Sequence, residues 1–175
     1  KYFTQQTKIV SLTHMSNVLG TINPLKKLSK MTHDVGAVFI VDGAQGIPHM
    51  KVNVQDLACD FYAFSGHKML GPTGVGILIG KTELFNAMQP FMGGGEMIHT
   101  VSMAKSTWNE VPWKFEAGTP NIAQVIGLGS ALDYLSNIGM DKIHEFEKSI
   151  LEIGVQKLSD ISGLKILGRP KEKGA

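Results

Sequence analysis

The sequence Ala-Val-Phe-Ile-Val-Asp-Gly-Ala-Gln, at positions 37–45, decides the fold. Residues 37–41 form an uninterrupted apolar run, which is typical of a central strand in a parallel sheet, and Asp42 closes the run. A second strand is predicted over 60–64, and it is closed by Ser-Gly-His-Lys at positions 65–68. Two neighbouring apolar runs therefore end in polar turns, one with an acid and the other with a lysine.

Other regular elements surround these two strands. Ile9–Leu12 predicts a further strand. Asn23 and Pro24 look like the N-cap and first residue of a helix that runs to about His33 and is ended by Gly36. A helix between two strands is a βαβ pattern, so the sequence predicts an α/β fold. The later elements are expected as a tight turn over 71–74, an antiparallel strand over 75–79, a short helix over 81–88 and an irregular segment over 89–117. A helix over 121–137 follows, and Asp141 is expected to cap a last helix that runs to about Leu158.

Apolar spacing predicts which faces the last two helices bury. The first helix would bury Ile122, Val125, Ile126, Leu128, Leu132 and Leu135, and the second would bury Ile143, Phe146, Ile150, Ile153 and Leu158. The small residues Gly127, Gly129 and Ala131 indicate close packing along the first of these helices. The run Leu164–Leu167 predicts one more strand, whereas 57–59 is too short to assign.

Composition excludes several classes of protein. The chain has 175 residues, 43% hydrophobic and 18% charged, with a net charge of +2, which predicts a soluble globular domain that binds no nucleic acid. We find no apolar stretch of membrane-spanning length and no signal-peptide pattern. The single cysteine, Cys59, fits a reducing cytoplasm. Because the chain begins at Lys1 rather than at a methionine, we expect a fragment of a longer protein.

The polar turns carry the chemistry of a pyridoxal phosphate (PLP) site. Lys68 supplies the amine for a Schiff base, and Asp42 supplies a carboxylate that holds a proton on the pyridine nitrogen. Ser65 and His67 could donate hydrogen bonds to a phosphate, and Gly66 lets the backbone approach closely. Taken singly, each residue has an ordinary alternative: Asp42 as a cap or turn residue, and Lys68 as a solvated charge.

Five ordered motifs make the chain resemble the class V aminotransferase group of PLP enzymes, and within it the SufS-type (group II) cysteine desulfurases and selenocysteine lyases. The motifs are Thr13–Gly20, Asp42–Gln45, Phe64–Lys68 with Gly71–Gly74, Gly93–Ile98 and Phe115–Asn121. The resemblance implies the PLP-dependent transferase (aspartate aminotransferase type I) fold, in which a mostly parallel sheet with one antiparallel strand is flanked by helices. Residues 1–160 would belong to the large cofactor-binding domain, and 161–175 would begin the C-terminal small domain.

The resemblance also implies roles for individual residues. Lys68 would bind the cofactor covalently and move protons, and Asp42 would pair with the pyridine nitrogen. Gln45 would bond the phenolic oxygen of the ring, and Ala44 would pack on the ring face. In the remaining contacts, Ser65 and His67 would hold the phosphate, Asn17 would lie near the ring oxygen and the substrate carboxylate, and Thr119 would reach the phosphate of the other subunit in a homodimer.

The activity implied is the conversion of L-cysteine, or L-selenocysteine, to L-alanine, with sulfur passed to an acceptor of the SufE or SufU kind for iron–sulfur cluster assembly. The family's sulfur-accepting cysteine has no counterpart here, since Cys59 reads as a buried structural residue, so the chain alone is expected to be inactive. A kynureninase-like lyase, another aminotransferase and a non-catalytic folding or interaction fragment remain as alternatives.

Two further groups of residues are given structural rather than binding roles. The histidines His14, His33, His49, His99 and His144 show no metal-ligand spacing, which favours surface or packing positions. Trp108 and Trp113 are interpreted as interface packing, and the long segment 89–117 as a dimer-contact loop.

Overall fold

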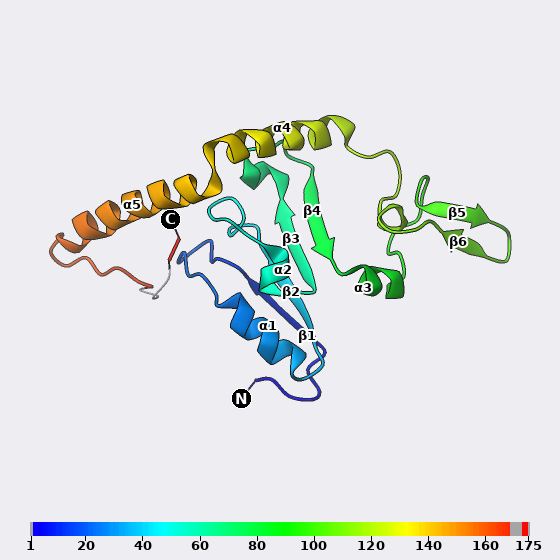
Figure 1. Cartoon of the computed structure of the whole chain (residues 1–175), viewed down its shortest axis with the longest axis horizontal. Helices are drawn as coiled ribbons and strands as arrows, with labels where there is room; N and C mark the ends of the chain where they lie inside the picture. The colour runs from blue at the N-terminus through cyan, green and yellow to red at the C-terminus, as the bar shows by residue number, and fades with distance from the viewer. Residues whose placement is uncertain (1, 169–172, 175) are drawn as a thin grey trace.

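A four-stranded sheet forms the centre of the molecule, as seen in a computed structural model that describes residues 2–168 and 173–174 (Figure 1). Its strands, in spatial order, are β1 (Ile9–Thr13), β2 (Val38–Asp42), β3 (Phe61–Ser65) and β4 (Gly76–Gly80). The first three strands run parallel, whereas β4 pairs antiparallel with β3. The α/β class, the parallel order and the single antiparallel strand are therefore confirmed.

Helices cover the sheet and cross its end (Figure 1). They are α1 (Leu25–His33), α2 (Val54–Leu57), α3 (Thr82–Ala87), α4 (Ile122–Ile138) and α5 (Met140–Ser159), with short 3₁₀ segments η1 (Gly66–Met69) and η2 (Trp113–Phe115). Helices α4 and α5 run one after the other along one margin of the molecule, and α4 packs on η1. None of the helices in the described ranges is long and apolar enough to cross a membrane.

Two apolar clusters hold these elements together. The first joins α1 to the sheet and contains the buried residues Leu25, Phe39, Val41, Cys59 and Tyr62. The second joins α4 to η1 and contains the buried residues Met69, Leu128 and Leu135. Burial of each large apolar side chain contributes roughly 1.5–3 kcal/mol, so the second cluster fixes the segment that follows β3.

Both expected helix caps are wrong. Asn23 does not cap α1, because its side-chain amide donates a 2.7 Å hydrogen bond to the Thr13 carbonyl and Pro24 occupies the cap position. Asp141 lies in the first turn of α5, which begins directly after Gly139 at φ 94°. The side-chain cap is found instead on α2, a helix that the sequence did not predict, where Asn53 accepts from the amides of Gln55 and Asp56.

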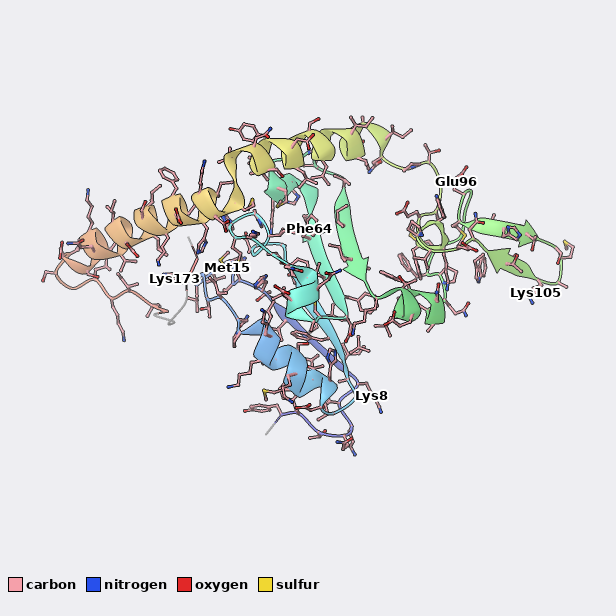
Figure 2. All side chains as sticks on the ribbon, in the orientation of Figure 1. Lys8, Met15, Phe64, Glu96, Lys105 and Lys173 are labelled. Atoms are coloured by element: carbon pink, nitrogen blue, oxygen red, sulfur yellow. The ribbon has the colours of Figure 1, made fainter. Side chains whose placement is uncertain are left out.

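The segment expected to be irregular contains a β-hairpin. Its strands are β5 (Ile98–Val101) and β6 (Ser106–Trp108), and they pair antiparallel. The strands are too short to show a clear alternating pattern, which explains why the sequence did not reveal them. Figure 2 labels Glu96 near the base of the hairpin and Lys105 at its tip.

The predicted buried faces of α4 and α5 are largely wrong. Only Leu128 and Leu135 are buried on α4, whereas Ile122, Val125, Ile126 and Leu132 are exposed, as are Phe146, Ile150, Ile153 and Leu158 on α5. No described element packs over these side chains. Leu164–Leu167 is likewise not a strand, because it pairs with none of the described strands. The expected domain boundary near residue 160 stays a prediction, and 169–172 and 175 lie outside the described residues.

Candidate functional site

Three parallel strands end together at one edge of the sheet. The strand register places Thr13 opposite Asp42, and Asp42 opposite Ala63. Backbone bonds continue past this level, from His14 N to the Asp42 carbonyl and from Gly43 N to the Ala63 carbonyl, each at 2.7 Å. The carboxyl ends of parallel strands are the usual place for a ligand in an α/β fold, and the loops that leave this edge carry Asn17, Gln45 and Lys68.

Asp42 is exposed at the end of β2. One carboxylate oxygen, Oδ1, accepts a 2.9 Å bond from the Ala44 amide, as in an Asx turn. Among the described residues nothing bonds Oδ2, so this oxygen is available to a ring nitrogen.

A buried histidine–tyrosine pair supports the turn after Asp42. The His14 Nδ1 atom lies 2.9 Å from the Tyr62 hydroxyl, and both side chains are buried. Burial lowers the pKa of His14 and raises the pKa of Tyr62, so both groups are neutral near pH 7 and the pair forms a neutral hydrogen bond. The sequence pattern alone indicates no role for Tyr62 at the site.

Two glycines make room for this pair. A Cβ atom on Gly43 would lie 2.0 Å from the Tyr62 ring, and one on Gly46 would lie 2.6 Å from the His14 ring. Any side chain at either position would displace the turn that carries Gln45. The spacing of Gly43 and Gly46 after a strand end is the sequence signal that could have revealed the pair.

Lys68 lies in η1, and its side chain is exposed. The segment is anchored by Met69, which is 4% exposed in the second apolar cluster. A hydrogen bond of 2.9 Å from Gly66 N to the carbonyl of Val75, the residue before β4, holds the start of η1. Leu70 ends η1 in the left-handed region at φ 60°. The packing of Met69, the hydrogen bond of Gly66 and the turn at Leu70 therefore hold the backbone around Lys68, while its side-chain amine is exposed to solvent.

A pocket of about 340 Å³ lies beside this sheet edge, and both Asn17 and Gln45 line it. Met15 and Lys173 also line it, and Figure 2 labels these two residues. Ala44 and Ser65 are half-buried at the same edge, and His67 is exposed. The structure thus brings seven of the eight predicted site residues to this edge: Asn17, Asp42, Ala44, Gln45, Ser65, His67 and Lys68.

Thr119 is the eighth predicted residue, and it does not join the others. It is exposed in the connection between η2 and α4, on the side of the hairpin (Figure 1). Trp108 and Trp113 share a separate pocket on that side with His99 and Glu110. The described residues form no cluster of metal-ligating side chains, and His14 packs in the interior as expected.

Cys59 lies far from this edge. It is buried just before β3 begins, whereas Lys68 follows the end of that strand. A five-residue strand spans about 17 Å, so β3 separates the thiol from the amine. Burial raises the pKa of Cys59, which keeps it a thiol, and its predicted structural position is confirmed.

A family model for aminotransferase class V matches residues 1–175. The chain belongs to the class V aminotransferase family. Among curated relatives, a probable cysteine desulfurase from Halalkalibacterium halodurans is 51% identical over 174 residues, covering 99% of this chain and 43% of the relative. A cysteine desulfurase from Haloferax volcanii is 49% identical over 164 residues, covering 94% of this chain and 38% of the relative. This family member spans less than half the length of these relatives.

Solved structures agree with this assignment. The crystal structure of the cysteine desulfurase CsdA from Escherichia coli superposes with a TM-score of 0.88 at 45% identity, covering 91% of this class V chain and 40% of CsdA. An apo cysteine desulfurase from Thermococcus onnurineus NA1 gives a TM-score of 0.84 at 42% identity, covering 87% and 38% of the two chains. The PLP-dependent fold predicted from the sequence is therefore confirmed.

The cofactor of the class V family is PLP, and the donor set at the sheet edge fits it. The set combines an amine that reaches solvent, a carboxylate oxygen without a described partner, an amide, a hydroxyl and an imidazole. These are the groups that a Schiff base, a pyridinium nitrogen, a phenolic oxygen and a phosphate require. The role of each single residue stays a prediction.

Proposed function

We propose that this chain is the central part of the cofactor-binding domain of a SufS-type cysteine desulfurase. The observation that carries the proposal is the sheet edge, where Asp42 and Lys68 follow the ends of the adjacent parallel strands β2 and β3. The similarity to cysteine desulfurases over nearly the whole chain supports it. The complete enzyme would act on L-cysteine, with L-selenocysteine as the alternative substrate.

Each site residue has a task that its position supports. Lys68 would hold PLP covalently and move a proton at the substrate α carbon. Asp42 Oδ2 would keep a proton on the pyridine nitrogen, because an adjacent anion favours the protonated ring. Gln45 would bond the phenolic oxygen, Ala44 would pack on the ring, and Ser65 and His67 would bind the phosphate. When bound, PLP withdraws electrons from the substrate α carbon.

Asn17 would orient the substrate from the loop that follows β1. Its amide lines the same pocket as Gln45 and is suited to bond a carboxylate oxygen. In the proposed reaction the carbon–sulfur bond of L-cysteine breaks, the sulfur joins a cysteine thiolate as a persulfide, and L-alanine leaves. Cys59 cannot be that thiolate because it is buried at the other end of β3, so the thiolate would come from outside these 175 residues.

Partners and location follow from the same proposal. The enzyme would be a homodimer in which Thr119 reaches the phosphate of the other subunit through the hairpin region. The exposed apolar side chains there support this, since Val101 is 70% exposed and Trp113 is 54% exposed. Sulfur would pass to an acceptor of the SufE or SufU kind for iron–sulfur cluster assembly, in the cytoplasm.

Chemical trapping tests the site. The chain is incubated with PLP, reduced with borohydride and digested, and the modified lysine is identified by mass spectrometry. We expect modification at Lys68, and no stable adduct in Lys68→Ala. Lys51, which is exposed in the loop after Gln45, is the control lysine. Trapping on Lys51 or on several lysines alike would refute a site built around Lys68.

A second measurement tests whether the 175-residue chain needs the rest of the protein for turnover. L-alanine release from L-cysteine is followed with the 175-residue chain and with the complete protein, both loaded with PLP. We expect turnover only from the complete protein, because the chain contains Cys59 and no other cysteine. Turnover by the chain alone would contradict this, and absence of turnover by the complete protein would contradict the desulfurase proposal itself.

A further inference from the structure

The loop that carries Gln45 is bonded to α5. Residues 43–50 form the first part of this loop, which connects β2 to α2. Near its end, the His49 ring nitrogen Nδ1 lies 3.0 Å from each carboxylate oxygen of Glu147 on α5. The ring nitrogen Nδ1 of His144, also on α5, donates a 3.1 Å hydrogen bond to the His49 carbonyl. One loop residue is thus held through its side chain and through its backbone by the same helix.

These contacts lie on a single face of α5. Met140, Ile143, His144 and Glu147 follow the three- and four-residue spacing of a helix face. Ile143 of α5 and Ile47 of the loop both pack against the second apolar cluster. The side chains of His49 and Glu147 are only 28% and 27% exposed, so solvent screens their interaction less than that of a surface pair.

The same cluster reaches the Lys68 segment. Met69 packs with Leu128 and Leu135 of α4, and Ile47 of the loop packs against this group. Helix α5 follows α4 directly, through Gly139 at φ 94° (Figure 1). The two consecutive helices therefore contact both polar turns of the site, α4 the turn with the lysine and α5 the turn with Gln45.

We propose that His49, His144 and Glu147 form a latch through which α5 positions Gln45 for the cofactor. The proposal rests on the proposed function, because Gln45 matters only if the sheet edge with Asp42 and Lys68 binds PLP. Gln45, His49 and Leu151 of α5 line the same pocket of about 340 Å³, so a shift of α5 would move the pocket wall and the amide together. The three latch residues are positioning residues and do not touch the reacting atoms.

Hydrogen exchange on the complete protein without cofactor tests the latch directly. Glu147→Ala is compared with Glu145→Ala, a matched control because Glu145 is an exposed carboxylate on the same helix. In Glu147→Ala we expect the amides of 43–50 to exchange about tenfold faster, since a charge-assisted hydrogen bond that restrains the loop is lost. The amides of β1 and β2 should keep their wild-type rates.

Cofactor affinity supplies the second readout. We expect Glu147→Ala to bind PLP about tenfold more weakly while borohydride still traps the cofactor on Lys68. Glu147→Gln keeps an acceptor for His49 and should recover most of the affinity. Equal exchange of 43–50 in Glu147→Ala and Glu145→Ala, or an increase spread evenly over the sheet, would overturn the latch. If the wild-type protein fails to bind PLP, the proposed function fails, whereas the exchange comparison still decides the latch.

Discussion

Asp60 is a buried carboxylate with every oxygen engaged. Lys81 Nζ donates to Oδ1 at 2.6 Å, and Phe39 N and His33 Nε2 donate to Oδ2 at 2.7 and 2.9 Å. The side chain is 6% exposed, and it ties α1, β2 and the end of β4 together at the edge of the sheet opposite Lys68. A buried charge stabilises the folded state only while its hydrogen-bond and ion-pair partners are present, so we expect substitutions of Asp60 to destabilise the fold.

We expect Asp60→Asn to lower the free energy of unfolding by about 3 kcal/mol, because the ammonium of Lys81 loses its anion and one buried acceptor becomes a donor. Urea unfolding of the chain measures the change. Asp34→Asn is the control, since Asp34 pairs with Lys30 on an exposed surface and should cost at most about 0.5 kcal/mol. Equal effects of the two substitutions would contradict a structural role for Asp60.

The same carboxylate predicts a pH dependence. Burial alone would raise the pKa of Asp60, but hydrogen bonds from Lys81, Phe39 and His33 outweigh it and lower the pKa below its ordinary value. A lowered folded-state pKa gives stability that is present above the unfolded-state pKa and is lost as the pH falls through the folded-state pKa. The stability difference between wild type and Asp60→Asn should therefore be constant from pH 7 to about pH 5 and shrink below about pH 4. A difference that grows in acid would refute this.

At the scale of elements, α4 contains two glycines with opposite surroundings. A Cβ atom on Gly127 would lie 2.7 Å from the Pro72 ring, in the turn between η1 and β4, whereas one on Gly129 would meet nothing within 4 Å. Gly127 thus allows α4 to approach the Lys68 segment closely. Gly129 only weakens the helix, because glycine loses more backbone entropy than alanine on folding.

The pair gives a prediction with an internal control. Gly129→Ala should stabilise the chain by about 0.5–1 kcal/mol through helix propensity. Gly127→Ala should destabilise it by about 1–3 kcal/mol, because the rigid Pro72 ring and the backbone must separate. Thermal or urea unfolding of both variants shows whether each substitution raises or lowers the free energy of unfolding. Stabilisation by both substitutions would show that α4 does not pack closely on the turn.

At this scale, the sequence predicted the features that a short segment specifies by itself and missed those that depend on contacts between distant segments. The strands β1 to β3 and the turns at Asp42 and Lys68 were predictable, because each apolar run ends at a polar residue that needs no distant partner to be recognised. The His14–Tyr62 hydrogen bond could not be predicted, because the two residues are 48 positions apart in the sequence. Only the register of the strands brings them into contact. The predicted buried faces of α4 and α5 were wrong for the same reason. Apolar spacing shows which side chains of a helix share a face, but it does not show whether another element of the chain covers that face.

At the scale of the whole molecule, α4 and α5 carry a set of exposed apolar side chains, which we call the exposed stripe. They follow α4 and α5, which run in sequence along one margin (Figure 1): Ile122, Val125, Ile126, Phe146, Ile150 and Ile153 are each at least 50% exposed. The apolar residues of α4 are spread around the helix instead of lying on one face, which is typical of a helix in the interior of a larger protein. This agrees with a chain that spans 43% of a similar desulfurase, and it supports the proposal of a longer enzyme.

The exposed stripe predicts that the 175-residue chain self-associates when it is prepared alone. We expect its sedimentation coefficient to rise with concentration. The double substitution Phe146→Glu and Ile150→Glu should weaken association at least about tenfold, since each buried side chain contributes more than about 1 kcal/mol. Lys148→Glu is the control, because it adds an acidic side chain to the same helix without removing an apolar one. Equal weakening by Lys148→Glu would show that net charge, and not the stripe, drives the association, and a concentration-independent monomer in the wild type would show that the stripe is not an interface.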